Sequence, residues 1–265
     1  AAGVQINKNS SGIGGSAKVS LRGIRSASGD NQPLYVIDGV PMLNIGTEQA
    51  YSAIGGTANA GNRDGGDGIS NLNPEDVESI SILKGAPAAA LYGSQAANGV
   101  ILITTKKGNT AGQRNIYFST GLTFDKAFSL PKMQNCYGVS DVVDSWGEKA
   151  YLPTSNELND FFRTGLTSIT SVSVNYGNEK IQTYFSYANT TGRGIVDKNQ
   201  LTKHNINLRE TAVMFNQRLK LDGNVNVMRQ IVKNKPVSGG FYMNPLVGLY
   251  RFPRGEDLSY YKDNY

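Results

Sequence analysis

The sequence is poor in the residues that carry covalent or metal chemistry. It contains one cysteine, Cys136, and one histidine, His204. A single cysteine excludes an internal disulfide and a metal site built from several thiolates. One histidine leaves acid–base catalysis few options, and no grouping of Ser, His and Asp indicates a nucleophile. We therefore expect no enzyme activity, no catalytic residue, no metal site and no cofactor, and we interpret His204 as a surface residue.

Long apolar runs and dense clusters of one charge are also missing. No window reaches the ~18 consecutive apolar residues of a membrane-spanning helix. The 26 Lys and Arg exceed the 21 Asp and Glu by a net charge of only +5, and they are spread along the chain. This distribution argues against a nucleic-acid partner. It leaves open a transmembrane β-barrel, because strands of ~10 alternating residues have a much weaker signature.

Aromatic residues are distributed unevenly and divide the chain in two. Of the 14 Tyr, 9 Phe and 1 Trp, only three lie in residues 1–110 and the other 21 lie in residues 111–265. A polar break, "KKGNTAGQRN" at 106–115, separates the two parts. We predict one domain over residues 1–110 and a second over residues 111–265.

The first part combines short β-type runs with signals for short helices, which indicates an α+β domain. In "NPED" (73–76), Asn73 can cap a helix that begins with Pro74. Pro87 opens a second short helix, "PAAALY", which Gly93 can end in the left-handed conformation. The strand-like "GVILITTKK" (99–107) follows.

The second part alternates apolar and polar residues, as antiparallel strands do. The pattern is clear in "RNIYFSTGLTF" (114–124), "SVSVNYG" (171–177) and "RLKLDGNVNVM" (218–228), and weaker in "LTKHNINLRE" (201–210). A soluble β-sandwich would show the same period, but polar faces of Ser, Asn, Thr and Lys favour a barrel. We predict a long loop over 125–167 and short turns at 178–180 and 214–218. The residues predicted to face lipid are Ile116, Phe118, Val172, Val174, Phe185, Tyr187, Val225 and Val227.

Three glycine-rich stretches match ligand-binding motifs only formally. "GIGGSA" (12–17) lacks the preceding strand and following helix of a dinucleotide fingerprint. "GAPAAALYGS" (85–94) lacks the Lys-Ser/Thr of a phosphate-binding loop, so it cannot place a cation on a phosphate. "NRDGGDG" (62–68) lacks the terminal Glu of an EF-hand loop, and we interpret it as a turn rather than a calcium site.

Several linked motifs resemble one family of membrane proteins. "VSLRGIRS" (19–26), "QPLYVIDGVPM" (32–42) and "ISNLNPEDVESISILKGAPAAALYGSQAANGVILITTKKG" (69–108) look like the plug domain of TonB-dependent outer-membrane receptors. Their order and spacing are similar to the SusC/RagA class of Bacteroidota. The resemblance implies a plug followed by antiparallel strands of a transmembrane β-barrel of ~22 strands, incomplete here. The small residues of 85–94 would then let a plug element pack closely.

This resemblance also implies a function. We expect active import of an oligomeric nutrient, a glycan or a peptide, across the outer membrane. The implied partners are a SusD-like surface lipoprotein, TonB acting through a segment upstream of this sequence, the oligosaccharide or peptide substrate, and outer-membrane lipid. We expect the sequence to be part of a longer protein. The alternatives are a siderophore or vitamin receptor without a lipoprotein lid, and a soluble β-rich adhesin or binding module.

One long stretch without periodicity, residues 41–72, is predicted to form the surface that meets the substrate. Loops of this length in compact domains are usually functional or disordered. The alternative is that the stretch only fills the lumen and braces the wall. The candidate substrate-facing residues are Asn59, Asn62, Arg63, Asp64 and Asp67.

Overall fold

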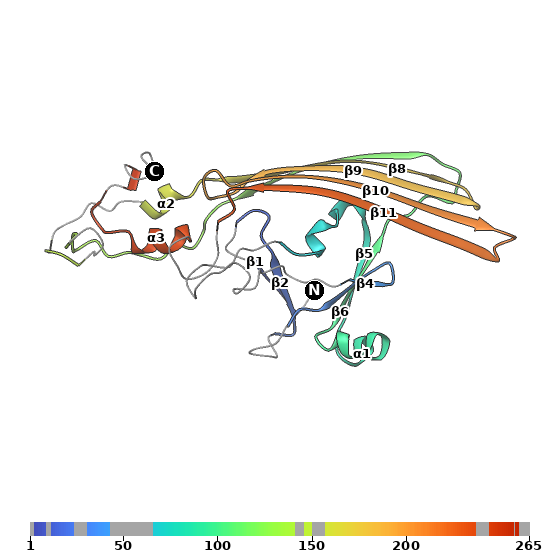
Figure 1. Cartoon of the computed structure of the whole chain (residues 1–265), viewed down its shortest axis with the longest axis horizontal. Helices are drawn as coiled ribbons and strands as arrows, with labels where there is room; N and C mark the ends of the chain where they lie inside the picture. The colour runs from blue at the N-terminus through green and yellow to red at the C-terminus, as the bar shows by residue number, and fades with distance from the viewer. Residues whose placement is uncertain are drawn as a thin grey trace, which may run out of the picture.

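A computed structural model describes most of the chain and contains three β-sheets. The described residues are 3–8, 12–23, 31–42, 66–140, 146–149, 157–236, 244–256 and 258–259. One sheet has two strands, one has four in the order β4-β3-β6-β5, and one has five in the order β11-β10-β9-β8-β7. Figure 1 shows the two smaller sheets lying on one side of the long five-stranded sheet.

The two smaller sheets and their short helices form what we call the N-terminal region, which corresponds to the predicted α+β part. Among its described strands, the one parallel pair joins β3 to β6. Its elements are β1 (Val4–Lys8), β2 (Ala17–Leu21), β3 (Leu34–Ile37), β4 (Val40–Met42), η1 (Ile69–Asn71), η2 (Pro74–Asp76), β5 (Val77–Leu83), α1 (Ala86–Tyr92), η3 (Gly93–Ala96) and β6 (Val100–Thr105).

The N-terminal region has its own apolar core on both faces of the four-stranded sheet. One cluster packs Val36 and Val100 against the helical segment through Ala88. The other packs Tyr35 and Ile101 against Leu21 of β2. Neither cluster contains a described residue of β7 to β11. These two clusters are therefore buried without help from the described strands of the large sheet.

The predicted helix ends are largely confirmed. The Asn73 side chain accepts a hydrogen bond from the Glu75 N–H at 3.2 Å, as a cap does, and the element is a single 3₁₀ turn because β5 follows at once. The second helix ends at Gly93, as predicted. Gly93 has a φ of 65°, but its ψ of −148° lies outside the left-handed helical region, so that detail of the prediction is wrong.

The large sheet consists of long antiparallel strands. They are β7 (Asn115–Asp125), β8 (Gly165–Gly177), β9 (Ile181–Arg193), β10 (Gln200–Met214) and β11 (Leu219–Lys233). The short turn at 178–180 is confirmed, and the second turn covers 215–218 because Met214 still belongs to β10. The connection between β7 and β8 covers 126–164, slightly less than the predicted 125–167, because both strands extend into it. The strands do not close into a barrel.

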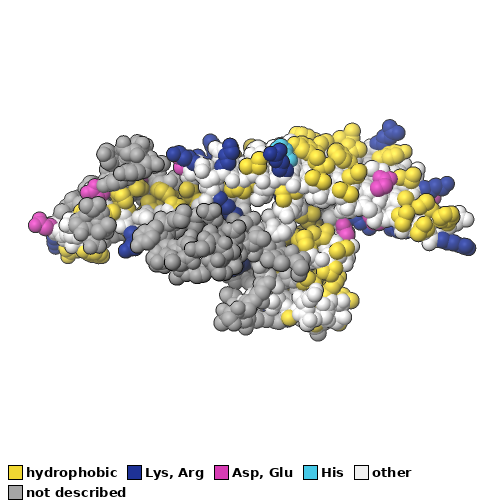
Figure 2. Space-filling model, viewed as in Figure 1, with side chains coloured by type: hydrophobic (Ala, Val, Ile, Leu, Met, Phe, Trp, Pro, Cys, Tyr) yellow, Lys and Arg dark blue, Asp and Glu magenta, His cyan; other side chains and the backbone are white. Residues whose placement is uncertain are grey.

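The register of the large sheet gives it two chemically different faces. The eight residues predicted to face lipid lie in two adjacent rows that cross all five strands. We call their side the outer face, and Val225 and Val227 are 61% and 59% exposed on it. The opposite, inner face meets the N-terminal region. Figure 2 shows apolar side chains gathered over these strands.

The remaining described helices are short. They are α2 (Glu157–Phe161) and α3 (Pro245–Arg251), and Asn244 caps the latter by accepting from the Leu246 N–H at 3.0 Å. No helix in the described ranges is long and apolar enough to cross a membrane.

The two faces of β11 can be distinguished by chemical labelling in membranes. After Cys136→Ser removes the natural thiol, we expect Val225→Cys and Val227→Cys to react slowly with a water-soluble maleimide, because lipid covers them. Asn224→Cys should react fast, because its side chain points to the other face. The measurement is the labelled fraction by mass spectrometry, with urea-unfolded protein as the control. Equal labelling of both faces in membranes would contradict the assignment.

Candidate functional site: the polar joint between the two regions

Alternate residues of β10 reach from the large sheet to the N-terminal region. Lys203 Nζ donates to the backbone oxygen of Ser70 at 2.6 Å. Two residues on, Asn205 Nδ2 donates to the backbone oxygen of Asn71 at 2.9 Å. Because side chains two apart in a strand share a face, one strand can contact successive points of the N-terminal region. The four β10 residues that do so are Lys203, Asn205, Asn207 and Arg209.

Asp76 is the most deeply buried acid at this joint. Its side chain is fully buried, and the Tyr184 hydroxyl donates to its Oδ1 at 2.9 Å. Asn207 Nδ2 lies 3.4 Å from its Oδ2. The backbone oxygen of Asp76 accepts from the Lys106 N–H at 2.8 Å, and this hydrogen bond connects the η2 turn to the end of β6. Two strands of the large sheet thus hold one carboxylate of the N-terminal region.

Arg209 forms the strongest electrostatic contact between the two regions. The residue is only 4% exposed, and its Nη1 lies 2.8 Å from Asp38 Oδ2. Its Nε and Nη2 donate to the two carboxylate oxygens of Asp222 on β11, both at 2.9 Å. Nη1 also donates to Thr105 Oγ1 at 2.6 Å. A planar guanidinium can make all these contacts because its donors form a fixed fork.

A tight turn places Asp38 in front of Arg209. Asp38 and Gly39 join β3 to β4 with φ values of 49° and 87°. Positive φ at both central residues is typical of the two-residue hairpin turn that Asp-Gly favours. Asp38 also accepts from the Thr105 N–H at 2.9 Å through Oδ1, so the turn is fixed to the end of β6. The Asp38 carboxylate is therefore fixed within the N-terminal region and faces Arg209 of the large sheet.

Close backbone approach makes a second joint near the other end of β10. The Ile13 N–H donates to Asn199 Oδ1 at 3.0 Å. Gly12 and Gly14 have φ values of +74° and +78°. A Cβ would come within 2.7 Å of Asn199 Oδ1 at Gly12 and within 2.8 Å of Val232 Cγ2 at Gly14. Gly12 and Gly14 of "GIGGSA" thus allow the backbone to pack closely against the large sheet. This agrees with the prediction that the stretch is not a dinucleotide-binding motif.

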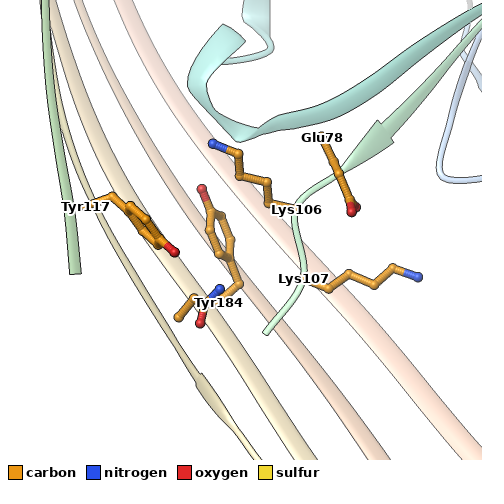
Figure 3. Close-up of a pocket in the computed structure, with 6 residues that line it drawn as sticks. Glu78, Lys106, Lys107, Tyr117 and Tyr184 are labelled. Carbon is orange, nitrogen blue, oxygen red and sulfur yellow. The ribbon is translucent and has the colours of Figure 1, made fainter. Parts of the chain in front are cut away.

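A cavity of about 370 Å³ lies between the end of β6 and the inner face of β7 to β9. Figure 3 shows Tyr117 and Tyr184 on strands of the large sheet, and Lys106 and Lys107 on the segment that leaves the N-terminal region. The Oδ1 atom of Asn175 is buried there and has no partner among the described residues. The joint is therefore incompletely filled at this point. The lining residues are Glu78, Lys106, Lys107, Tyr117, Asn175 and Tyr184.

The candidate substrate-facing residues are only partly described by the structure. Asn59, Asn62, Arg63 and Asp64 lie outside the described residues. Asp67 is 7% exposed, and its carboxylate accepts from the N–H groups of Ala17 at 2.8 Å and Ser70 at 2.9 Å. This carboxylate thus connects β2 to η1 within the N-terminal region. A substrate-facing role for the set stays a prediction.

Asp67 also acts on a neighbouring tyrosine. Burial, and to a lesser extent the negative charge of Asp67, raises the pKa of Tyr35 to about 12. Tyr35 is neutral at physiological pH, as an ordinary tyrosine is, and its burial places it in the apolar cluster that contains it. In the described ranges, no group of three or more His, Cys, Asp or Glu side chains could hold a metal ion.

Sequence reasoning did not identify the joint residues Asp38, Asp76, Tyr184 and Arg209 as a group. One signal was present: "LTKHNINLRE" alternates poorly because both of its faces carry polar residues. Partly buried polar residues on a strand indicate contact with another polar surface, since each buried polar group needs a partner. The identity of that surface could not be read from spacing.

Removing the Arg209 side chain should loosen the Asp38 hairpin. We expect Arg209→Met to lower the free energy of local opening at the Thr105 amide by about 2 kcal/mol, roughly 30-fold in exchange rate, because two acids lose their shared cation. The measurement is hydrogen exchange of the full-length protein. Arg163→Met is the matched control, because Arg163 pairs with Asp197 at 2.7 Å and does not touch the N-terminal region. Unchanged exchange at Thr105 in Arg209→Met would contradict this role.

Comparison with known proteins places these features in a family context. The family described as TonB-dependent Receptor Plug Domain matches residues 1–100. The TonB-dependent receptor SusC of Bacteroides thetaiotaomicron is 32% identical over 264 residues, which cover 94% of this chain and 24% of that protein. The chain thus spans about a quarter of this relative's length.

Two further similarities bear on fold and type. The RagAB peptide transporter has a TM-score of 0.68 at 20% identity, covering 98% of this chain and 31% of that chain, which shows a shared fold. The ferrienterobactin receptor of Escherichia coli is 34% identical over 122 residues, which cover 44% of this chain and 15% of that receptor. The similarity to SusC therefore extends over much more of the chain.

Proposed function

Because the chain belongs to the SusC/RagA type of TonB-dependent receptors, we propose that the whole protein imports an oligomeric nutrient, a glycan or a peptide, across the outer membrane. Residues 1–110 are the plug, and residues 111–265 are the first part of the barrel wall. A SusD-type surface lipoprotein captures the substrate, and TonB acts on the plug. The homologous receptors are transporters, and no covalent chemistry is required.

The observation that carries this proposal is the chemical character of the joint between plug and wall. The apolar clusters of the plug include no described wall residue. Across the joint, the described contacts are mainly hydrogen bonds and the Arg209–Asp38 ion pair, with close packing of Gly14 against Val232 and of Ile13 against Gly192. Polar contacts can be exchanged for contacts with water at a net cost of about 0.5–1.5 kcal/mol each. A plug held in this way can leave the wall without exposing its own core.

Unsatisfied polar atoms on the inner face lower the cost of separation further. Asn175 Oδ1, Asn207 Oδ1 and Thr211 Oγ1 are buried without a partner among the described residues. A buried polar atom without a partner costs about 1–3 kcal/mol, and exposure to water removes that cost. The free-energy cost of separating plug and wall would therefore be partly offset where these atoms become hydrated.

The cavity beside Tyr184 is where we expect the joint to open first. Its volume of about 370 Å³ lies between the Lys106–Lys107 segment and the wall. Among the described residues, Lys107 makes a long ion pair, with Nζ 3.9 Å from Asp222 Oδ2. A pull on the plug at this point would have to break the Tyr184–Asp76 hydrogen bond before it reached the Arg209 fork.

A siderophore receptor is the second candidate function, because the ferrienterobactin receptor matches part of the chain. The SusC similarity covers 94% of the chain and includes the wall strands, which favours nutrient import with a lipoprotein. The two candidates differ in partner and in substrate, so one purification can separate them.

The partner experiment uses the full-length receptor from native outer membranes. We expect an affinity-tagged receptor, extracted in mild detergent, to co-purify with a surface lipoprotein in near-equal amount. The measurement is intact-complex mass spectrometry followed by peptide identification. An unrelated outer-membrane barrel protein that carries the same affinity tag is the control for nonspecific lipoprotein recovery.

Other outcomes of the same purification have distinct meanings. A receptor without lipoprotein that binds a ferric siderophore would support the siderophore receptor. Release from membranes by a urea wash without detergent would contradict a barrel and support the β-rich binding module.

The long stretch over residues 41–72 provides a second test, on substrate capture. We propose that Asn59, Asn62, Arg63 and Asp64 face the substrate. Replacing these four by Ala should weaken substrate binding at least tenfold while the amount of folded receptor in the membrane stays the same.

Asp67→Ala is the structural comparison for that test. It should lower the amount of folded receptor, because Ala17 and Ser70 lose their acceptor. The measurements are isothermal titration calorimetry and heat-modified mobility on gels. If the variant with all four Ala substitutions binds substrate as tightly as wild type, these residues would have only a bracing role.

A further inference from the structure

The outer face of the large sheet has an apolar band that a polar row interrupts toward the loop side. On β11, outward residues from Leu219 to Val227 are apolar except for Gly223. Those nine residues span about 27 Å along the strand, or about 20 Å of membrane thickness at a tilt of ~40°. That length is close to the apolar band of about 25 Å found in outer-membrane barrels. The next outward residue on β11, two positions after Val227, is Arg229.

A polar row crosses the outer face at this level, and Leu122 and Ile231 are apolar again in the next outward row. The polar row consists of Thr120, Thr170, Asn189, His204 and Arg229. Arg229 is exposed and lies directly opposite His204 in the β10–β11 register. The His204 Nδ1 atom lies 2.9 Å from the Tyr187 hydroxyl and 3.1 Å from Asn189 Nδ2. The ring also stacks against Tyr187, with centroids 6.2 Å apart. The imidazole is therefore held in place beside the arginine.

The electrostatic surroundings of this group favour an anion. Two further exposed basic residues, Arg193 and Lys233, lie farther along the outer face on the loop side. No described acid pairs with any of the three cations. The only outward acid on β7 to β11 is Glu210, six residues from His204, about 20 Å along the strand. Figure 2 shows the histidine at the edge of the apolar patch, next to a basic side chain.

We propose that Arg229, with His204 and Asn189, binds the phosphate of a lipid headgroup in the leaflet on the loop side of the membrane. This inference rests on the proposed function, because it requires these strands to span the outer membrane. The apolar rows contact the acyl chains, and the guanidinium makes charge-assisted hydrogen bonds to phosphate oxygens. A polar imidazole held at the same level supplies a further hydrogen-bonding group.

Lipid binding by the purified full-length receptor tests the proposal. The probes are lipid A and chemically dephosphorylated lipid A, added to receptor in detergent and counted by native mass spectrometry. We expect wild type to retain phosphorylated lipid A preferentially and Arg229→Gln to retain about fivefold less, the effect of one cation near an anionic surface. Arg229→Lys should keep most of the binding. Arg218→Gln, at the short turn on the other end of β11, is the matched control and should behave as wild type.

Each remaining outcome would overturn the proposal in a recognisable way. Equal retention of the two lipids would mean that the apolar band alone holds them. Equal loss in Arg229→Gln and Arg218→Gln would mean a general charge effect. Displacement of lipid A by excess inorganic phosphate would assign the site to a free anion. A wild-type receptor that does not fractionate with outer membranes would refute the proposed function, and the lipid site with it.

Discussion

The structure depends on one buried cation that belongs to the wall and completes the plug. Arg209 satisfies Asp222 beside it in the sheet and Asp38 on the plug hairpin at the same time. Without the plug, Arg209 would keep one acid and lose the other. Without Arg209, the Asp38 turn would present its charge to a wall that already carries Asp222. The net stabilisation from a buried pair is small, but removal of one member leaves an uncompensated charge. The contact therefore specifies the position of the plug more than it stabilises the fold.

Polar contact is compatible with a stable plug because the plug buries its apolar side chains internally. Val36 and Val100 pack within one cluster, and Tyr35 and Ile101 pack within the other. Nearly all hydrophobic stabilisation of this region is then independent of the wall. The wall in turn has its two apolar rows on its far side, and its inner face mixes polar residues with a few apolar ones such as Tyr184 and Val232. Two bodies with this division of surfaces can separate and rejoin without either losing its core.

Much of the fold could be predicted from local signals, whereas the joint could not. The Asn73 cap and the alternation of β7, β8, β9 and β11 depend on residues close in sequence, so spacing was enough to find them. The Arg209–Asp38 pair joins residues 171 positions apart, and nothing local specifies such a partner. Gly93 shows a finer limit: its sequence position predicts a positive φ, but the following segment sets ψ. In β10 the weak alternation was itself informative, because both faces of the strand contact polar groups.

The two faces of β10 together fix its register. Leu208 and Arg209 are consecutive. The Leu208 side chain points to the outer face, and the Arg209 side chain points to the plug. A slip by one residue would exchange them, placing a guanidinium among apolar side chains and a leucine against Asp38. Such a slip would also move His204 from the outer row to the position of Asn205 at the plug. The strand is hydrogen-bonded to β9 and β11 along almost its whole length, so that register is kept by the sheet itself. The plug contacts can therefore break while the strands of the wall keep their register.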